Sequence, residues 1–303
     1  MTMVYLNGRL VDEKRAVVSA FDRGFLYGDG LFETMRAYGG RVFRLGEHLA
    51  RLKASAKALR IPFKTSRKEI ESAVERLLCF NVAQPPSAAA VSSSHPRAGE
   101  PHQKDAYVRL TLTRGPHSGD LKLDTGARPT LVIQARKFHG YPKTLYKTGM
   151  KLALADAVRA TGSGVGRHKT LNYLENLLAR DAAKRGGFDE ALFLDERGFV
   201  AECSASNIFW VRRCALFTPG IDMNILAGIT RAAVSEIARA AGLKVREGRF
   251  RLAELKSADE VFLTNSLMEI MPVCDVAGNR FKPGAVTREL AAAYRTLVAA
   301  ECG

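Results

Sequence analysis

Apolar residues in the first 140 positions follow strand spacing in some segments and helix spacing in others. Two short apolar runs flank Asn7-Gly8, a pair that favours a tight hairpin turn. Over residues 45–59 apolar side chains recur every three or four positions, which predicts an amphipathic helix. Ser66, followed three residues later by a glutamate, resembles a capping box and predicts a second helix over 66–80. The period-two runs AYVRLTLTRG and RPTLVIQARKF predict two further strands.

Residues 83–105 interrupt this pattern. The segment holds four prolines, four serines and one aliphatic side chain larger than alanine, so it cannot bury enough apolar surface to offset the entropy of ordering. We expect a mobile surface loop. His95 and His102 lie within it and are expected to be solvent-exposed, because histidine ligands need fixed neighbours to orient them.

Beyond residue 140 strands and helices are interspersed without a regular β-α-β rhythm. ALFLD, FVAECSASNIFWV and EVFLTN are typical of strands, and helices are predicted over 230–241 and from 286 onward. This order favours an α+β fold over a doubly wound parallel sheet. A chain of 303 residues is long for one domain. We therefore predict two domains, residues 1–140, which include the 83–105 insertion, and residues 141–303.

The composition is that of an ordinary globular protein, with 47% hydrophobic and 25% charged residues. No stretch approaches the roughly 18 unbroken apolar residues of a membrane span, and no secretory signal is visible, so we expect a cytoplasmic location without membrane binding. The five cysteines form no CxxC pair, which argues against a metal site or a disulfide framework.

The formal net charge of +15 raises the alternative of a nucleic-acid-binding protein. The 46 Lys and Arg residues are, however, spread along the chain with no aromatic-basic recognition motif beside them. Because net charge alone is evidence about solubility and association, we expect a solvated basic surface and no nucleic-acid partner.

Lys169 is the first candidate for chemistry. It stands ahead of a predicted helix in RHKTLNYLENLLAR, where Leu171, Leu174 and Leu178 have the spacing of one buried helix face. A side chain at a strand-to-helix junction can be held in a defined direction, and a lysine that loses its proton can attack an aldehyde or remove a substrate proton. Taken alone, the residue would be an exposed lysine at a helix start.

Three further sequence elements are candidates for binding a cofactor together with this lysine. Glu202 lies among apolar residues in RGFVAECSASNIFW, and a carboxylate buried there needs a cationic or hydrogen-bonding partner. The alternative is that Glu202 lies on the solvent-exposed face of a half-buried strand. In LAGITR, Gly228 precedes a helix that begins near Ile229 and Thr230, and free N–H groups at a helix start suit a phosphate. Arg51 in EHLARL can add a bidentate clamp to that phosphate.

In this order and at these separations, KTLNYLENLLAR, AECSASNIF, LAGITR and EVFLTNSLMEIMPV resemble the class-IV aminotransferase family of pyridoxal-phosphate enzymes. RGFLYGDGLFETMRAYGGRVFRLGEHLARL is similar to the same family, so the resemblance covers nearly all of the chain except 83–105. It implies a two-domain fold-type IV enzyme, with a smaller N-terminal α/β sandwich, a larger C-terminal pseudo-barrel and a homodimeric state.

The resemblance also implies pyridoxal 5'-phosphate as the cofactor. Lys169 would bind it covalently, Glu202 would pair with its pyridine nitrogen and Tyr173 would approach its phenolic oxygen. The phosphate would be held by Arg51, Ile229, Thr230 and Thr264.

Family membership leaves the reaction open, because such enzymes share the cofactor chemistry and differ in substrate-side residues. ECSASNIFW and NSLMEIMPV are most similar to 4-amino-4-deoxychorismate lyase, whereas Tyr107 and Arg109 match the pocket of branched-chain aminotransferases. Phe32 departs from the D-amino-acid enzymes. We favour the lyase and keep an amino-acid transaminase as the alternative. The substrate would be a small amino or carboxylate molecule, with Arg36 and Arg109 as candidate carboxylate ligands, unless each pairs with an acid of the protein.

Overall fold

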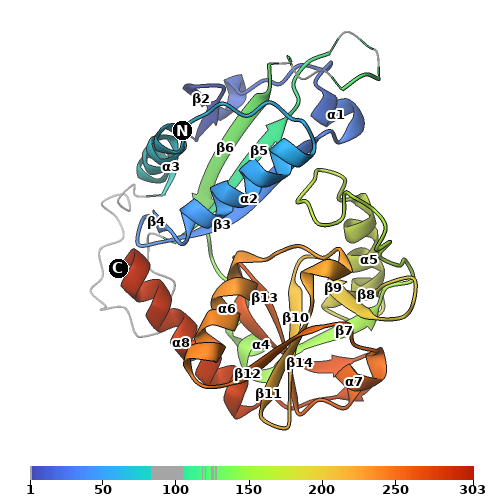
Figure 1. The fold of residues 1–303 in the computed structure, drawn as a ribbon. Helices are drawn as coiled ribbons and strands as arrows, with labels where there is room; N and C mark the ends of the chain where they lie inside the picture. The colour runs from blue at the N-terminus through green and yellow to red at the C-terminus, as the bar shows by residue number, and fades with distance from the viewer. Residues whose placement is uncertain (1, 83–104, 118, 120, 124–125, 127) are drawn as a thin grey trace. The chain divides into compact units, whose positions relative to one another are not determined.

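The structure is a computed structural model and describes residues 2–82, 105–117, 119, 121–123, 126 and 128–303 (Figure 1). The predicted loop at 83–105, with His95 and His102, lies outside the described residues apart from Asp105. Contacts within the chain divide it into two compact units. The first unit comprises Met1–Gly140, Lys169–Leu171 and Val298–Gly303, and the second comprises Tyr141–His168 and Asn172–Leu297.

The first unit contains a six-stranded antiparallel sheet in the order β2-β1-β6-β5-β3-β4. Its hairpin at Asn7-Gly8 is confirmed, because Leu6 pairs with Arg9 and both turn residues have positive φ, 47° and 90°. Such turns match the right-handed twist of the strands that they join. The strands are β1 Met3–Leu6, β2 Arg9–Asp12, β3 Gly30–Tyr38, β4 Arg41–Val42, β5 Ala106–Thr113 and β6 Thr130–Lys137.

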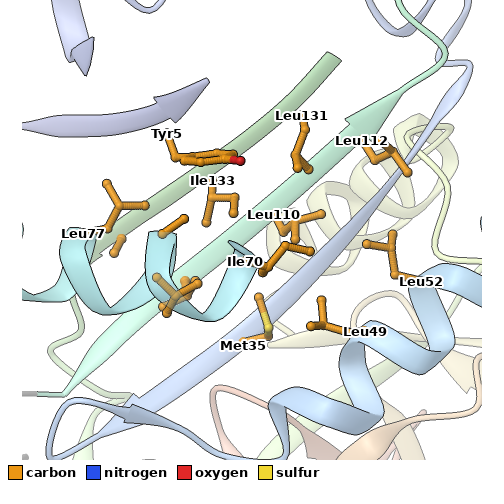
Figure 2. Packing of buried hydrophobic residues seen from close by; sticks show 14 of the residues in the cluster. Tyr5, Met35, Leu49, Leu52, Ile70, Leu77, Leu110, Leu112, Leu131 and Ile133 are labelled. Atoms are coloured by element: carbon orange, nitrogen blue, oxygen red, sulfur yellow. The ribbon is translucent and has the colours of Figure 1, made fainter. Parts of the chain in front are cut away.

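Two helices pack on one face of this sheet, as Figure 2 shows from close by. They are α2 Leu45–Ala58 and α3 Arg67–Asn81, which confirms both predicted helices; the short α1 Arg23–Tyr27 and a 3-10 turn at Glu13–Arg15 complete the unit. Alternation along β5 turns Leu110 inward with 0% exposure, a burial that stabilises the fold by about 1.5–3 kcal/mol. The same alternation directs Tyr107 and Arg109 to the opposite face of the sheet.

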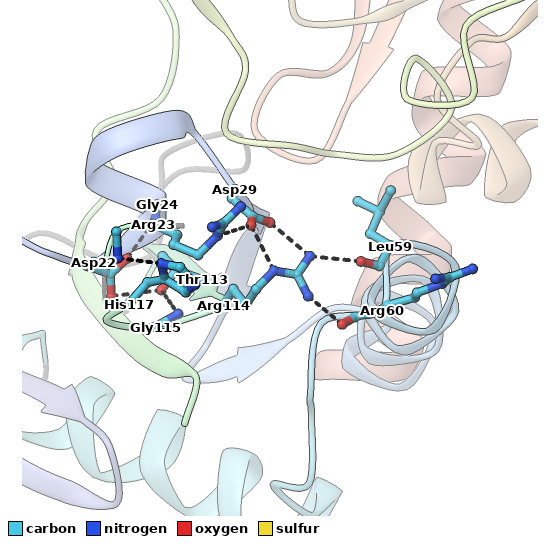
Figure 3. A network of polar contacts seen from close by, with 11 residues as sticks. Asp22, Arg23, Gly24, Asp29, Leu59, Arg60, Thr113, Arg114, Gly115 and His117 are labelled. Atoms are coloured by element: carbon cyan, nitrogen blue, oxygen red, sulfur yellow. Dashed lines mark hydrogen bonds and ion pairs between the residues drawn. The ribbon is translucent and has the colours of Figure 1, made fainter. Parts of the chain in front are cut away.

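A polar network ties the ends of β3 and β5 to the helix layer (Figure 3). Arg114 is 2% exposed and contacts both carboxylate oxygens of Asp29, from Nε at 2.8 Å and Nη2 at 3.1 Å. Its guanidinium also donates to the carbonyls of Arg60 at 2.5 Å and Leu59 at 2.9 Å. Burial opposes ionisation of Asp29, but hydrogen bonds from Arg114 and Arg23 lower the pKa of this carboxyl. Arg114 is therefore a structural cation with its charge compensated.

The second unit contains a nine-stranded mixed sheet in the order β12-β11-β10-β13-β14-β7-β8-β9, with β15 paired to β14. β9 also packs beside β10 and β11, so the sheet curls back on itself as the predicted pseudo-barrel requires. The strands are β7 Met150–Leu154, β8 Glu190–Leu194, β9 Val200–Cys203, β10 Asn207–Arg212, β11 Ala215–Pro219, β12 Lys244–Gly248, β13 Glu260–Asn265, β14 Glu269–Val276 and β15 Asn279–Arg280.

The helices of the second half of the chain are α4 Lys143–Thr148, α5 Leu174–Arg185, α6 Ile229–Ala240, α7 Leu252–Lys256 and α8 Ala285–Cys302, with a 3-10 turn at Ile221–Met223. Helices α4, α5 and α6 of the second unit pack against this sheet, and the unit also includes α7 and residues 285–297 of α8. Pairs of neighbouring strands are mostly antiparallel and helices follow at irregular intervals, so the predicted α+β class is confirmed. No helix formed by the described residues is long and apolar enough to cross a membrane.

One expectation about α5 is wrong. Leu171 lies outside the helix, and Leu174 and Leu178 are 68% and 59% exposed in the chain, whereas Asn176 and Ala183 are the buried positions. A hydrogen bond accounts for which side of the helix is buried. Asn176 Nδ2 donates to the carbonyl of Ser204 at 2.6 Å, and this bond holds the Asn176 side of the helix toward the sheet.

Candidate active site

The sequence-predicted residues fall into two groups, one in each unit. Lys169, Arg51, Arg36, Tyr107 and Arg109 belong to the first unit. The second unit contains Tyr173, Glu202, Ile229, Thr230 and Thr264.

Lys169 is fixed to the edge of β3 by its backbone. The N–H of Phe32 donates to the carbonyl of Lys169 at 2.8 Å, and the N–H of Leu171 donates to the carbonyl of Gly30 at 3.0 Å. Leu31 and Thr170 form the antiparallel bridge between these two bonds. The lysine thus sits on a rigid strand edge, which limits the directions open to its side chain.

Phe32 carries two cations on its ring. Lys169 Nζ lies 4.5 Å from the ring centroid, and the Arg109 guanidinium carbon lies 4.1 Å from it. The electron-rich face of a ring attracts cations at such distances. Arg109 reaches this ring because its cross-strand partner is Thr34, two residues from Phe32 on the same face of the sheet. The predicted catalytic lysine and one predicted substrate ligand therefore share a single aromatic platform.

Arg51 belongs to a buried triad that the sequence did not predict. Glu33 is 1% exposed and accepts from Arg51 Nε at 2.8 Å and Nη2 at 2.6 Å, and it contacts His48 Nδ1 at 2.7 Å. Burial opposes ionisation of Glu33, but the charge of Arg51 and the His48 hydrogen bond lower the pKa of this carboxyl to about 2. Burial also lowers the pKa of His48, which favours its neutral form. The glutamate in the apolar run GLFETM was the available signal.

Arg36 and Tyr107 are cross-strand partners on β3 and β5. Arg36 Nη2 contacts the buried Asp105 at 2.7 Å, and the guanidinium stacks over Tyr38 at 4.4 Å and Phe138 at 4.9 Å. This arginine thus has a protein acid as a partner, the alternative raised for it from the sequence. Its role as a substrate ligand stays a prediction.

Glu202 on β9 is linked to the LAGITR segment. Its Oε2 accepts from the N–H of Leu226 at 3.1 Å and from Asn207 Nδ2 at 3.4 Å. It is the partly exposed residue of a strand whose other residues are buried. These bonds hold the carboxylate in one orientation at the surface of the sheet. There it can accept a hydrogen bond from a protonated nitrogen.

The start of α6 has the features of an anion site. Gly228 is the N-cap and has no side chain to occupy the first N–H groups, which belong to Ile229 and Thr230. Thr264 is 1% exposed, and within the described part of the chain its Oγ1 has no hydrogen-bond partner. A buried hydroxyl without a partner is costly, so a phosphate oxygen is a fitting acceptor for it. The residues of the second unit thus fit a phosphate-bearing ring cofactor.

Tyr173 is held by a polar network that the sequence did not reveal. Its hydroxyl donates to the carbonyl of Ser204 at 2.5 Å, and the Ser204 hydroxyl bonds to the buried Glu190. Burial, followed by the charges of Glu190 and Glu202, raises the pKa of Tyr173 to about 12. The phenol is therefore neutral and oriented at ordinary pH.

The sequence pattern of the family described as "Amino-transferase class IV" matches residues 30–276. A "Putative branched-chain-amino-acid aminotransferase" of Methanocaldococcus jannaschii is 38% identical over 301 residues, 97% of this chain and 96% of that protein. An "Aminodeoxychorismate lyase" of Bacillus subtilis is 36% identical over 270 residues, 89% of this chain and 85% of that protein.

Solved structures similar to this chain include enzymes of the same kind as these relatives. A branched-chain aminotransferase from Thermoproteus uzoniensis with norvaline has a TM-score of 0.86 at 32% identity, covering 99% of this chain and 95% of its own. A second branched-chain aminotransferase, from T.th. and solved with pyridoxamine 5'-phosphate, has a TM-score of 0.84 at 28% identity, covering 99% and 94%.

Proposed function

Because the chain belongs to the class IV aminotransferase family of pyridoxal-phosphate-dependent enzymes, we propose that it is a 4-amino-4-deoxychorismate lyase that forms 4-aminobenzoate and pyruvate. The supporting observation is a cluster around Asn265. Its Nδ2 donates to the carbonyl of Ala205 at 3.0 Å, and its Oδ1 accepts from the N–H groups of Leu267 and Met268 at 2.9 and 2.8 Å. The two segments that resemble the lyase, 202–207 and 265–268, are thereby joined.

The residues proposed to hold the cofactor are those that the family resemblance implies. Within the second unit, the fixed carboxylate of Glu202, the neutral phenol of Tyr173 and the hydroxyl of Thr264 support this assignment. In the proposal, Lys169 binds the cofactor covalently, Glu202 pairs with the pyridine nitrogen, Tyr173 contacts the phenolic oxygen, and the phosphate is bound by Arg51, Ile229, Thr230 and Thr264.

The bound cofactor supplies an electron sink for the carbon that carries the substrate amine. Lys169 would take the proton from that carbon at Nζ. In the lyase reaction the bond from the ring to the enolpyruvyl oxygen then breaks, the ring becomes aromatic, and the departing enolpyruvate takes up a proton to become pyruvate. Arg109, which shares the Phe32 ring with Lys169, is the proposed partner of a substrate carboxylate.

A transaminase is the second candidate. Its support is the arrangement of Tyr107 and Arg109 on β5, which carry the match to the branched-chain pocket, together with the aminotransferase names of several relatives. In that reaction Lys169 would return the same proton to a different carbon, so both reactions use the same cofactor contacts.

The deciding experiment supplies the purified holoprotein with aminodeoxychorismate, and separately with branched-chain or D-amino acids plus 2-oxoglutarate. Release of 4-aminobenzoate and pyruvate in equal amounts supports the lyase, with a Lys169→Ala variant as the control for nonenzymatic breakdown. Glutamate formation without aminobenzoate would overturn the lyase in favour of the transaminase.

The proposal includes a cytoplasmic homodimer. Exposed apolar side chains support self-association, because apolar surface is stabilised when a partner removes it from water. Leu174, Leu177 and Leu178 on α5 are 55% exposed or more, and Phe21 and Phe25 in the first unit are 69% and 77% exposed. Light scattering coupled to size-exclusion chromatography should give twice the 33.1 kDa chain mass. A monomer at all accessible concentrations would contradict it.

A further inference from the structure

Asn207 lies between two parts of the proposed cofactor site in the second unit. It is the first residue of β10, it is 4% exposed, and its cross-strand partner on β13 is Thr264. A buried asparagine at a strand start must satisfy both ends of its amide. The contacts of those two ends show what the residue connects.

The amide nitrogen of Asn207 contacts the acid and its loop. Nδ2 donates to the carbonyl of Leu226 at 3.0 Å and lies 3.4 Å from Glu202 Oε2. The N–H of Leu226 donates to the same Glu202 oxygen at 3.1 Å. The three residues form a closed ring of hydrogen bonds, so the position of Glu202 depends on the position of the loop that leads into α6.

The amide oxygen of Asn207 packs against the start of α6. A methyl group on Gly228 would overlap Asn207 Oδ1 and would lie 3.3 Å from its Cγ. Gly228 has φ −67° and ψ 136°, which any residue can adopt, so its lack of a side chain serves this close approach. Asn207 therefore touches the N-cap of α6 with one end of its amide and Glu202 with the other.

We propose that Asn207 is a positioning residue that sets the spacing between the Glu202 carboxylate and the N-terminus of α6. This inference rests on the proposed roles of Glu202 and α6, which would hold opposite ends of one rigid cofactor. Only an amide fits both contacts, because a carboxylate at 207 would have no N–H to donate to Glu202 or to Leu226. The residue acts through these two groups and needs no contact with the substrate.

The test compares Asn207→Asp and Asn207→Ala with wild type, using cofactor-free protein titrated with pyridoxal 5'-phosphate. Loss of a hydrogen-bond partner that orients a ligand group typically weakens binding by about 10–100-fold, and we expect a change of this size. In Asn207→Asp a second carboxylate beside Glu202 should also move the pH midpoint of the bound cofactor's visible absorbance by about one unit. A purely structural asparagine would lower thermal stability and leave that midpoint in place.

Two variants serve as controls. Asn81→Asp removes an asparagine whose Nδ2 donates to two backbone carbonyls in the first unit, at 2.8 and 3.0 Å, so it should lower stability without changing the absorbance midpoint. Glu202→Gln should itself weaken cofactor binding and alter the absorbance. If Glu202→Gln behaves as wild type, the proposed cofactor site fails and this inference fails with it.

Other outcomes concern Asn207 alone. If Glu202→Gln is impaired while both Asn207 variants bind the cofactor as wild type does, the positioning role is refuted and the site stands. If the Asn207 variants do not fold, Gly228→Ala displaces the amide without altering Asn207 and should reproduce the weaker binding. Wild-type binding by Gly228→Ala would then refute the inference.

Discussion

The substitution Gly228→Ala tests how closely the N-cap of α6 is packed. The added methyl group would overlap Asn207 Oδ1 and lie 3.2 Å from the Cβ of Arg231, closer than most real Cβ contacts. The Asn207 amide must rotate away and lose its bonds to Leu226 and Glu202, which together contribute about 2 kcal/mol. Replacing glycine by alanine at an allowed φ also restricts the unfolded chain, which stabilises by about 0.4–1 kcal/mol. We expect a net loss of about 1–2 kcal/mol.

The matched control is Gly186→Ala at the C-cap of α5. This glycine has φ −79°, and its nearest neighbours would lie at an ordinary 3.4 Å from the new methyl group, so only the unfolded-chain effect remains. Trp210, the one tryptophan of the sequence, is buried on β10, so its fluorescence reports unfolding of the unit that contains both glycines.

Urea unfolding of the cofactor-free variants, followed at Trp210, gives the difference in unfolding free energy from the shift in midpoint at constant slope. The two variants should differ by about 2 kcal/mol, with Gly186→Ala the more stable. Equal midpoints, or a Gly228→Ala protein more stable than wild type, would show that the Asn207 amide moves aside without losing its hydrogen bonds.

Three further changes address other parts of the chain. Lys169→Ala should lower turnover by about 10²–10⁴-fold and abolish the visible absorbance of covalently bound cofactor, and unchanged colour would exclude Lys169 as the attachment point. Arg114→Met removes a buried guanidinium and leaves the partly exposed carboxylate of Asp29 with the Arg23 ion pair, so the unfolding free energy should fall by about 1–3 kcal/mol; a loss below 1 kcal/mol, typical of exposed pairs at about 0–1, would contradict the burial argument. Glu33 has its folded-state pKa depressed from 4.5 to about 2, so its stabilisation is present above pH 4.5 and lost as the pH falls toward 2. The slope of stability against pH in that window should be smaller in Glu33→Gln than in wild type.

Local structure was predictable because it depends on neighbours along the chain. The Asn7-Gly8 turn, the helix over Leu45–Ala58 and the strand over Ala106–Thr113 follow from turn chemistry and from apolar spacing, which act over a few residues. The exposed leucines of α5 show the limit of that spacing. A buried asparagine with a fixed hydrogen bond decided which face of the helix turned inward.

The amino-acid order alone established the family and the cofactor class. The motifs KTLNYLENLLAR, AECSASNIF and LAGITR, and the distances between them along the chain, can be read without knowing the conformation. Strand register determined the rest. Lys169 joins the edge of β3, Glu33 meets Arg51 of α2, and Asn207 meets the start of α6 only after segments separated in sequence have paired or packed together. Such contacts depend on the alignment of whole strands, and no window of a few residues contains that information.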